Sequence, residues 1–132
     1  MLVPVTDFNE LMKRIRIVEG RYSTNFRYIR QLKANLLAAD RIQPCEVPRD
    51  LVTMNSFVQL HRTEPIAMDF CIQLVYPEYA NVRETKVSVF SELGVAVFLK
   101  RVGEELSYDT WKTNNRLLIT GIPFQPEVNT YR

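Results

Sequence analysis

Few residues of this sequence have the types and spacing that catalysis or metal binding requires. The two cysteines, Cys45 and Cys71, lie far apart, and the only histidine is His61. Structural zinc sites use closely spaced Cys and His ligands, so we expect reduced thiols and a surface histidine. Asp7 and Glu10 could share a helical face, where a cap and a solvated surface explain them better than a metal site. The scattered glycines form no phosphate-binding loop, and no nucleophile lies beside a base. We expect no enzyme activity, no metal and no cofactor.

The charges suggest an electrostatic role for the first third of the chain. Residues 1–44 carry eight Lys or Arg and four Asp or Glu, a net +4, whereas residues 45–132 carry a net −2. The predicted basic arm consists of Lys13, Arg14, Arg16, Arg21, Arg27, Arg30 and Lys33. Such a cluster favours contact with an acidic partner or with nucleic-acid phosphates, although a solvated helix surface gives the same pattern.

Two helices are expected to carry this arm. Over residues 7–19, apolar residues recur every three or four positions, with Thr6 or Asp7 as the N-cap and Gly20 as the C-terminal cap. Over residues 23–40, a second apolar seam comprises Tyr22, Phe26, Ile29, Leu32 and Leu36. Two helices joined by a few residues fold back on each other. We therefore predict an antiparallel helical hairpin over residues 1–44.

The pattern changes after residues 43–50, a proline-containing stretch that we interpret as a linker. Alternating apolar residues and turn residues predict strands at 56–61, 68–74, 86–90, 106–108 and 116–124, with a turn at 113–115. The short apolar stretch over 95–100 fits a strand or a helix, and we favour a short helix because Ser91 can cap it. We therefore predict an α+β fold in which residues 45–132 form a C-terminal domain with an antiparallel sheet and one short helix.

Four segments of this predicted domain carry a resemblance to a known family. They are residues 48–56, 74–77, 87–103 and 124–127. In this order and spacing they resemble the C-terminal domain of the Gre transcript-cleavage factors and, more closely, the Rnk proteins, called regulators of nucleoside diphosphate kinase. The resemblance implies an FKBP-like domain that docks on bacterial RNA polymerase beside its secondary channel, with the helical arm pointing toward the channel. A likeness of fold to FKBP does not by itself imply prolyl isomerase activity.

The resemblance also implies where the partner binds. The family's common Ser-Pro-Leu-Gly turn stands here as Ser91-Glu92-Leu93-Gly94, with Glu92 in the position of the proline. In Gre factors this loop contributes to polymerase binding, so the resemblance places Phe90, Ser91, Glu92 and Leu93 in the interface. The alternative is that Ser91 only caps the short helix and that Leu93 belongs to the core.

The expected tip of the arm differs from that of the Gre factors. Those factors present two carboxylates at the tip of a long coiled coil, where they help hold a second Mg²⁺ at the polymerase active site. Residues 19–24 of this chain have one carboxylate, Glu19, and one guanidinium, Arg21. A helix over 7–19 spans only about 20 Å at 1.5 Å per residue. We therefore predict a regulator that binds RNA polymerase without stimulating transcript cleavage.

Other functions and the location follow from the same features. A Gre-type elongation factor that rescues backtracked polymerase, a module that dimerises through the seam between Phe26 and Leu36, and a prolyl isomerase are the alternatives. No apolar run of about 18 residues is present, and the N-terminus lacks the basic-then-apolar order of a signal peptide. We expect a cytoplasmic protein without membrane contact, and a monomer.

Overall fold

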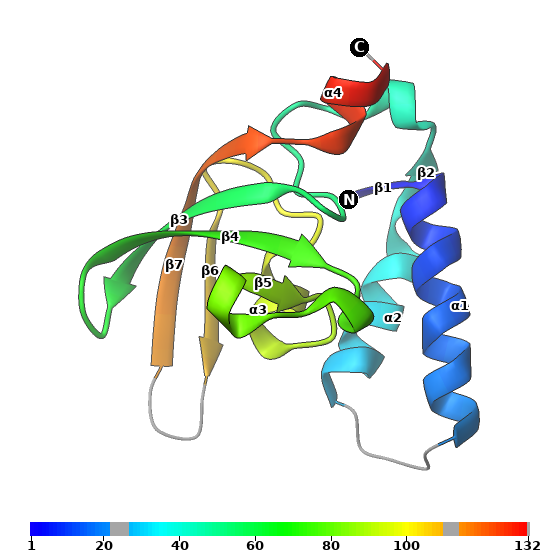
Figure 1. Cartoon of the computed structure of the whole chain (residues 1–132), viewed down its shortest axis with the longest axis horizontal. Coiled ribbons are helices and arrows are strands. Elements are labelled where there is room, and N and C mark those ends of the chain that lie inside the picture. Colours follow the sequence, from blue (N-terminus) through cyan, green and yellow to red (C-terminus); the bar gives the residue numbers. More distant parts are fainter. Residues whose placement is uncertain (22–26, 110–113, 132) are drawn as a thin grey trace.

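The computed structural model describes residues 1–21, 27–109 and 114–131, and Figure 1 shows how its elements follow one another. A short strand, β1 (Leu2–Pro4), leads directly into helix α1 (Val5–Arg21). Helix α2 (Arg27–Ala38) runs back beside α1, and strand β2 (Asp40–Ile42) then pairs in parallel with β1. The predicted antiparallel hairpin is confirmed, and the β1–β2 pair joins its two outer ends.

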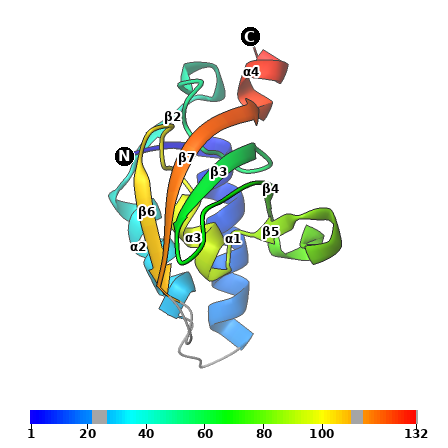
Figure 2. The same cartoon turned by 90° about the vertical axis from the view of Figure 1, so that its left-hand side faces the viewer.

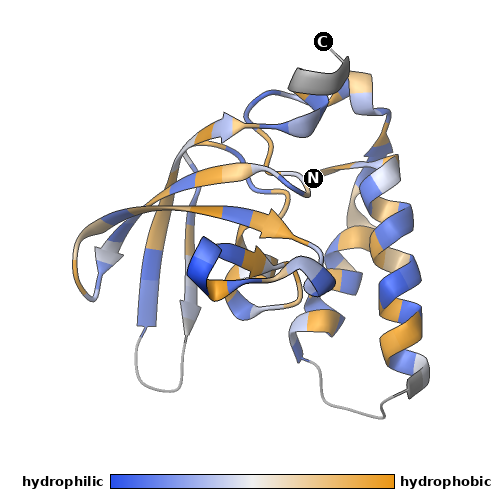
Figure 3. Ribbon diagram, viewed as in Figure 1, coloured by the Kyte–Doolittle hydropathy of each residue, from blue (hydrophilic) through white to orange (hydrophobic). Residues whose placement is uncertain are grey.

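The helices bury the apolar residues whose spacing predicted them. Leu11 and Ile15 of α1 and Leu32 and Leu36 of α2 are completely buried. Figure 3 shows apolar and polar residues alternating along both helices. The buried residues belong to the same core cluster as Val58 of the sheet, so the hairpin packs against the sheet. The predicted domain boundary between residues 44 and 45 stays a prediction.

A curled five-stranded sheet forms the rest of the fold, in the order β5-β4-β3-β7-β6. Its strands are β3 (Phe57–Glu64), β4 (Met68–Val75), β5 (Lys86–Ser88), β6 (Glu105–Asp109) and β7 (Asn114–Phe124). Neighbouring strands are antiparallel except β4 and β5, which are parallel. The predicted α+β fold with a mainly antiparallel sheet is confirmed.

Short helices and 3₁₀ turns connect the strands or, in the case of α4, follow the last strand. They are η1 (Pro44–Glu46), η2 (Pro77–Tyr79), η3 (Val82–Glu84), α3 (Glu92–Val97) and α4 (Pro126–Tyr131). Helix α3 packs so closely on the end of β5 that a Cβ atom on Gly94 would collide with the backbone oxygen of Ser88. Among the described residues, no helix is long and apolar enough to cross a membrane.

Two expectations about the ends of α1 were wrong. Neither Thr6 nor Asp7 is the N-cap, because the helix already begins at Val5, directly after β1, and both residues lie inside its first turn. The Asp7 side chain is buried there and accepts a hydrogen bond from the backbone N–H of Met54. Gly20 does not end the helix, because α1 continues through Arg21.

Other boundaries also shift. The predicted helix over 95–100 lies earlier, at 92–97, because Ser91 caps it and Leu99 takes a left-handed backbone conformation just beyond it. Asn114 and Asn115 belong to β7, since they pair with β6 rather than forming the turn. The remaining turn residue at 113, and the seam residues at 22 and 26, lie outside the described residues. The strands β1 and β2 and the helix α4 had no counterpart in the sequence prediction.

Candidate docking site

The loop between β5 and α3 is held by its own hydrogen bonds. The Phe90 N–H donates to the Ser88 hydroxyl at 3.0 Å. The Ser91 hydroxyl donates to the Ser88 carbonyl oxygen at 2.6 Å and accepts from the Gly94 N–H at 3.0 Å. Ser91 therefore caps α3, as its residue type favours. These bonds fix the backbone that carries the four predicted interface residues.

The structure separates those four residues. Phe90 is half-buried and lines a groove of about 570 Å³ between α1 and η2, together with Ile17, Val18, Pro77 and Glu78 among others. Like Phe90, Leu93 is half-buried and packs against the core, and of the two it is Phe90 that lines this groove. Ser91 is occupied by its capping bonds. Phe90 is thus the apolar member of the quartet that faces an open groove.

Glu92 faces a different groove. It lies with Tyr28 of α2 and Tyr108 of β6 along a depression of about 410 Å³ between α2, α3 and β6. The nearby Glu92 carboxylate, foremost, raises the pKa of the Tyr28 hydroxyl. Burial is the main cause that raises the pKa of Tyr108, and the charge of Glu92 raises it to a smaller extent. Glu92 therefore interacts with α2 and β6 within the chain.

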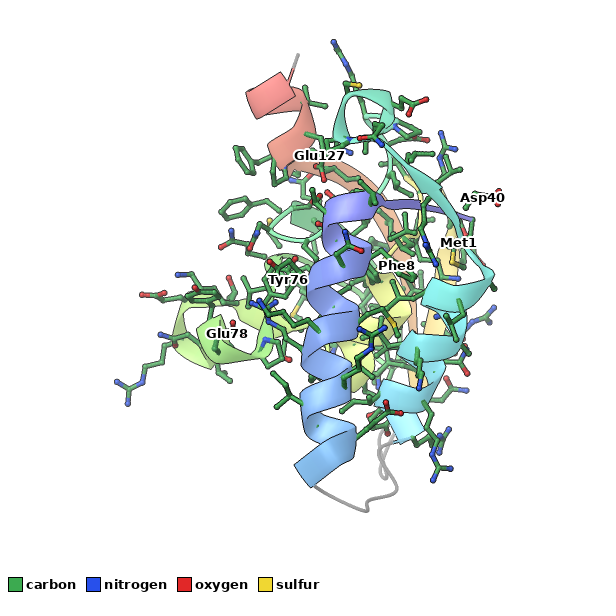
Figure 4. All side chains as sticks on the ribbon, turned by 90° about the vertical axis from the view of Figure 1, so that its right-hand side faces the viewer. Met1, Phe8, Asp40, Tyr76, Glu78 and Glu127 are labelled. Carbon is green, nitrogen blue, oxygen red and sulfur yellow. The ribbon has the colours of Figure 1, made fainter. Side chains whose placement is uncertain are left out.

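Arg14 of the predicted basic arm is already engaged with the sheet domain. Its guanidinium donates to both carboxylate oxygens of Glu78, with Nη2 at 2.6 Å and Nε at 3.1 Å, and also contacts Glu10 at 3.0 Å. The same guanidinium lies 3.9 Å from the ring centre of Tyr76. The pKa of Arg14 is raised, and the largest cause is its side-chain hydrogen bond with Glu78. Figure 4 shows Tyr76 and Glu78 beside α1, where this cluster ties the arm to η2.

The other predicted basic residues lie on both helices, and some of them contact groups of the same chain. Lys33 pairs with Glu19 across the hairpin at 3.1 Å, and Arg27 lies 5.8 Å from the ring centre of Tyr28. Lys13 and Arg16 are exposed on α1, and Arg30 is exposed on α2. The side chain of Arg21 lies outside the described part of the chain. The basic arm is thus divided between two helices, and part of it neutralises acidic groups of the same chain.

Comparison with known proteins places the sheet domain in a family. A family model described as "Transcription elongation factor, GreA/GreB, C-term" matches residues 47–123. The chain belongs to the GreA/GreB family. The matched range contains the loop from Ser88 to Gly94 and the whole five-stranded sheet apart from the last residue of β7, whereas α1 and α2 precede it.

Relatives of this GreA/GreB-family chain include the Rnk group that the sequence resembles. The chain is 31% identical over 97 residues to the "Regulator of nucleoside diphosphate kinase" of Escherichia coli K12. The aligned residues cover 73% of this chain and 71% of that protein. A protein of Shigella flexneri with the same name matches equally. The predicted resemblance is confirmed.

Solved structures share the fold over more than nine tenths of this chain. The transcription elongation factor GreA/GreB from Nitrosomonas europaea matches at 25% identity with a TM-score of 0.78, over 94% of this chain and 99% of that one. The Gfh1 protein of Thermus aquaticus matches at 21% identity with a TM-score of 0.51, over 92% and 97%. At that identity, the second match shows the fold alone.

Sequence reasoning missed a buried polar cluster in this GreA/GreB-family chain. Thr53 Oγ1 donates to Glu127 Oε2 at 2.8 Å and lies 2.9 Å from Ser56 Oγ, and the Met54 N–H donates to Asp7 at 3.1 Å. Asp7 and Glu127 are only 7% and 5% exposed. Burial raises the pKa of Asp7 to about 7, with a further rise from the nearby Glu127 and an opposing effect of the Met54 N–H. Figure 4 places Glu127 of α4 above the first turn of α1.

No signal of local spacing could have found this cluster, because its members come from three distant segments. It joins the first turn of α1, the turn before β3, and α4. Over the described ranges, no group of three or more His, Cys, Asp or Glu side chains is arranged to hold a metal ion.

Proposed function

We propose that this chain is a transcription regulator that binds bacterial RNA polymerase through its C-terminal domain, near the secondary channel, and does not stimulate transcript cleavage. The observation that carries the proposal is the rigid loop from Ser88 to Gly94, which lies within the family match and holds Phe90 at the groove between α1 and η2. A pre-ordered aromatic side chain in a groove can bind a partner without losing much conformational freedom.

The composition of the tip supports a role without cleavage. Holding a second Mg²⁺ requires paired oxygen ligands, and residues 19–24 supply a single carboxylate, Glu19. That carboxylate also forms an ion pair with Lys33. Helix α1 has 17 residues, which corresponds to about 25 Å at 1.5 Å per residue. The proposed regulator would act by occupying the channel entrance or by competing with Gre factors, which places it in the cytoplasm.

The burial of the described part of the proposed seam argues against the dimer alternative. Ile29, Leu32 and Leu36 of the proposed seam are at most 7% exposed, because they pack in the core of the same chain. A monomer therefore fits these residues better than a dimer that pairs through them. A Gre-type elongation factor remains the rival function, and the single acid at the tip argues against it.

Contact of the arm with nucleic acid is a secondary proposal. Lys13 and Arg16 are exposed, and phosphate neutralisation by such residues needs no specific sequence. The ion pairs of Arg14 and Lys33 reduce the charge available for it.

The test compares two aromatic residues in a polymerase-binding assay. Phe90→Ala should weaken binding to core RNA polymerase by about tenfold or more, the effect of losing about 1.4 kcal/mol. Phe57→Ala removes a partly exposed ring from the sheet and should leave binding within about twofold, an effect below roughly 0.5 kcal/mol. Thermal unfolding of both variants checks that the fold is kept. Equal binding by the Phe90 variant and the wild type would reject the proposed site, and strong stimulation of transcript cleavage on stalled complexes would reject the proposed mode of action.

A further inference from the structure

Residues 77–85, the knob, project from the body of the protein as two successive 3₁₀ turns between β4 and β5. In Figure 2 the knob stands out in light green beyond β5, and Figure 4 shows it on the far side of α1 from α2, with Glu78 at its base. Its position on the outside of the sheet domain makes it accessible to a large partner.

The knob exposes apolar side chains that the fold does not use. Val82 is 93% exposed and Tyr79 is 62% exposed. Val82 is the most exposed of the large hydrophobic residues in the described part of the chain. An isolated exposed apolar residue needs no explanation, but two of them on one projecting element offer a contact surface.

Hydrogen bonds hold the knob in one shape. The Asn81 side chain accepts from the Arg83 N–H at 3.0 Å, and the backbones of Asn81 and Lys86 exchange two hydrogen bonds of 3.0 and 2.9 Å. Thr85 takes a left-handed conformation, at φ 56°, which side chains with a Cβ seldom adopt. Glu84 and Lys86 form an ion pair at 2.9 Å. A surface ordered in this way loses little conformational entropy when a partner binds.

The base of the knob continues into the proposed docking groove. Pro77 and Glu78 line that groove together with Phe90 and with Ile17, which is half exposed. The ion pair of Arg14 with Glu78 fixes the knob against α1 at the same place. The exposed apolar residues of the knob are therefore next to the surface that Phe90 offers.

We infer that the knob is a second contact of the RNA polymerase interface, in which Val82 and Tyr79 enter an apolar depression of the polymerase surface. This inference rests on the proposed function and adds to it a surface that the loop from Ser88 to Gly94 does not include. Arg83 is exposed next to Val82, and its guanidinium has no partner among the described residues. The depression is accordingly expected to have an acidic rim, since a rim charge is paired across an interface.

The test places a charge on the knob and an identical charge elsewhere. Val82→Asp should weaken binding of the full chain to core RNA polymerase by about tenfold or more, equivalent to about 1.4 kcal/mol. Ile66→Asp is the matched control, because Ile66 is 69% exposed on the distant turn between β3 and β4. The control should bind within about twofold of the wild type, a change below roughly 0.5 kcal/mol. Both sites are exposed, so both variants should fold normally.

Arg83→Glu tests the expected acidic rim. It should weaken binding at low salt, and binding should recover at high salt.

The outcomes separate this inference from the proposed function. Weak binding by the Val82 variant and normal binding by the Ile66 control support the knob as a contact. Normal binding by both the Val82 variant and the wild type would show that the knob is not a contact, and it would leave the proposed Phe90 site unaffected. Absence of wild-type binding overturns both.

Discussion

The buried carboxylate of Asp7 gives a quantitative prediction about stability. Burial raises its pKa from 3.8 to about 7 in the folded chain, so the folded state keeps a proton that the unfolded state releases above about pH 4. The stabilisation that depends on this proton is complete at low pH and is lost as the pH rises through 7. A shift of roughly three units at 1.36 kcal/mol each corresponds to about 4 kcal/mol, an upper estimate for a site next to a second carboxylate.

Asp7→Asn should remove this pH dependence. The amide is neutral at every pH, and its oxygen can still accept the hydrogen bond from the Met54 N–H. We expect the variant to exceed the wild type in stability at about pH 8 by up to about 4 kcal/mol, and to equal it near pH 4. Urea unfolding at several values between these limits measures the difference. Asp40→Asn, at an exposed aspartate, is the control and should change little. Parallel loss of stability in the wild type and the Asp7 variant would refute the reasoning.

Two further substitutions test the packing of the site. Gly94→Ala should destabilise the chain by about 1–3 kcal/mol, because the new Cβ would meet the Ser88 carbonyl oxygen. Thermal unfolding measures this loss of stability. An unchanged unfolding midpoint would contradict the close approach of α3 to β5. Glu78→Gln removes one partner of the exposed Arg14 ion pair, so it should cost less than about 1 kcal/mol. The loss of stability that this substitution causes in denaturant unfolding should shrink at high salt. It should also shrink at acid pH, where Glu78 in the wild type takes up a proton. A loss that does not change with salt would argue for a packing role instead.

Sequence reasoning recovered the features that depend on local periodicity. The seam residues Ile29, Leu32 and Leu36 are buried as their spacing predicts, and the alternation in β3 places Val58 and Leu60 in the core. The Ser91 cap was predictable too, because its hydrogen bonds reach only three residues along the chain. These features need no knowledge of distant segments.

The features that sequence reasoning missed depend on distant contacts. Asp7 has the residue type of a helix cap, and only the approach of Met54 and Glu127 turns it into a buried acid. Arg14 looked like part of a free basic surface, yet Glu78, 64 positions away, forms an ion pair with it. Local spacing cannot predict such pairs, because tertiary packing creates them.

The split of the predicted interface has the same origin. Phe90 and Glu92 are neighbours along the loop, but α3 begins between them and turns Glu92 toward Tyr28 and Tyr108. The family resemblance located the loop, whereas the packing of α1 and α2 decides which of its side chains remain available to a partner.

The measurement that tests the central claim most directly is binding of the full chain to bacterial core RNA polymerase, with a Gre factor as competitor. We expect saturable binding that the Gre factor displaces, which would mean that both occupy the same site. Absence of binding at micromolar concentration, or binding that the Gre factor leaves unchanged, would contradict docking at the shared site near the secondary channel.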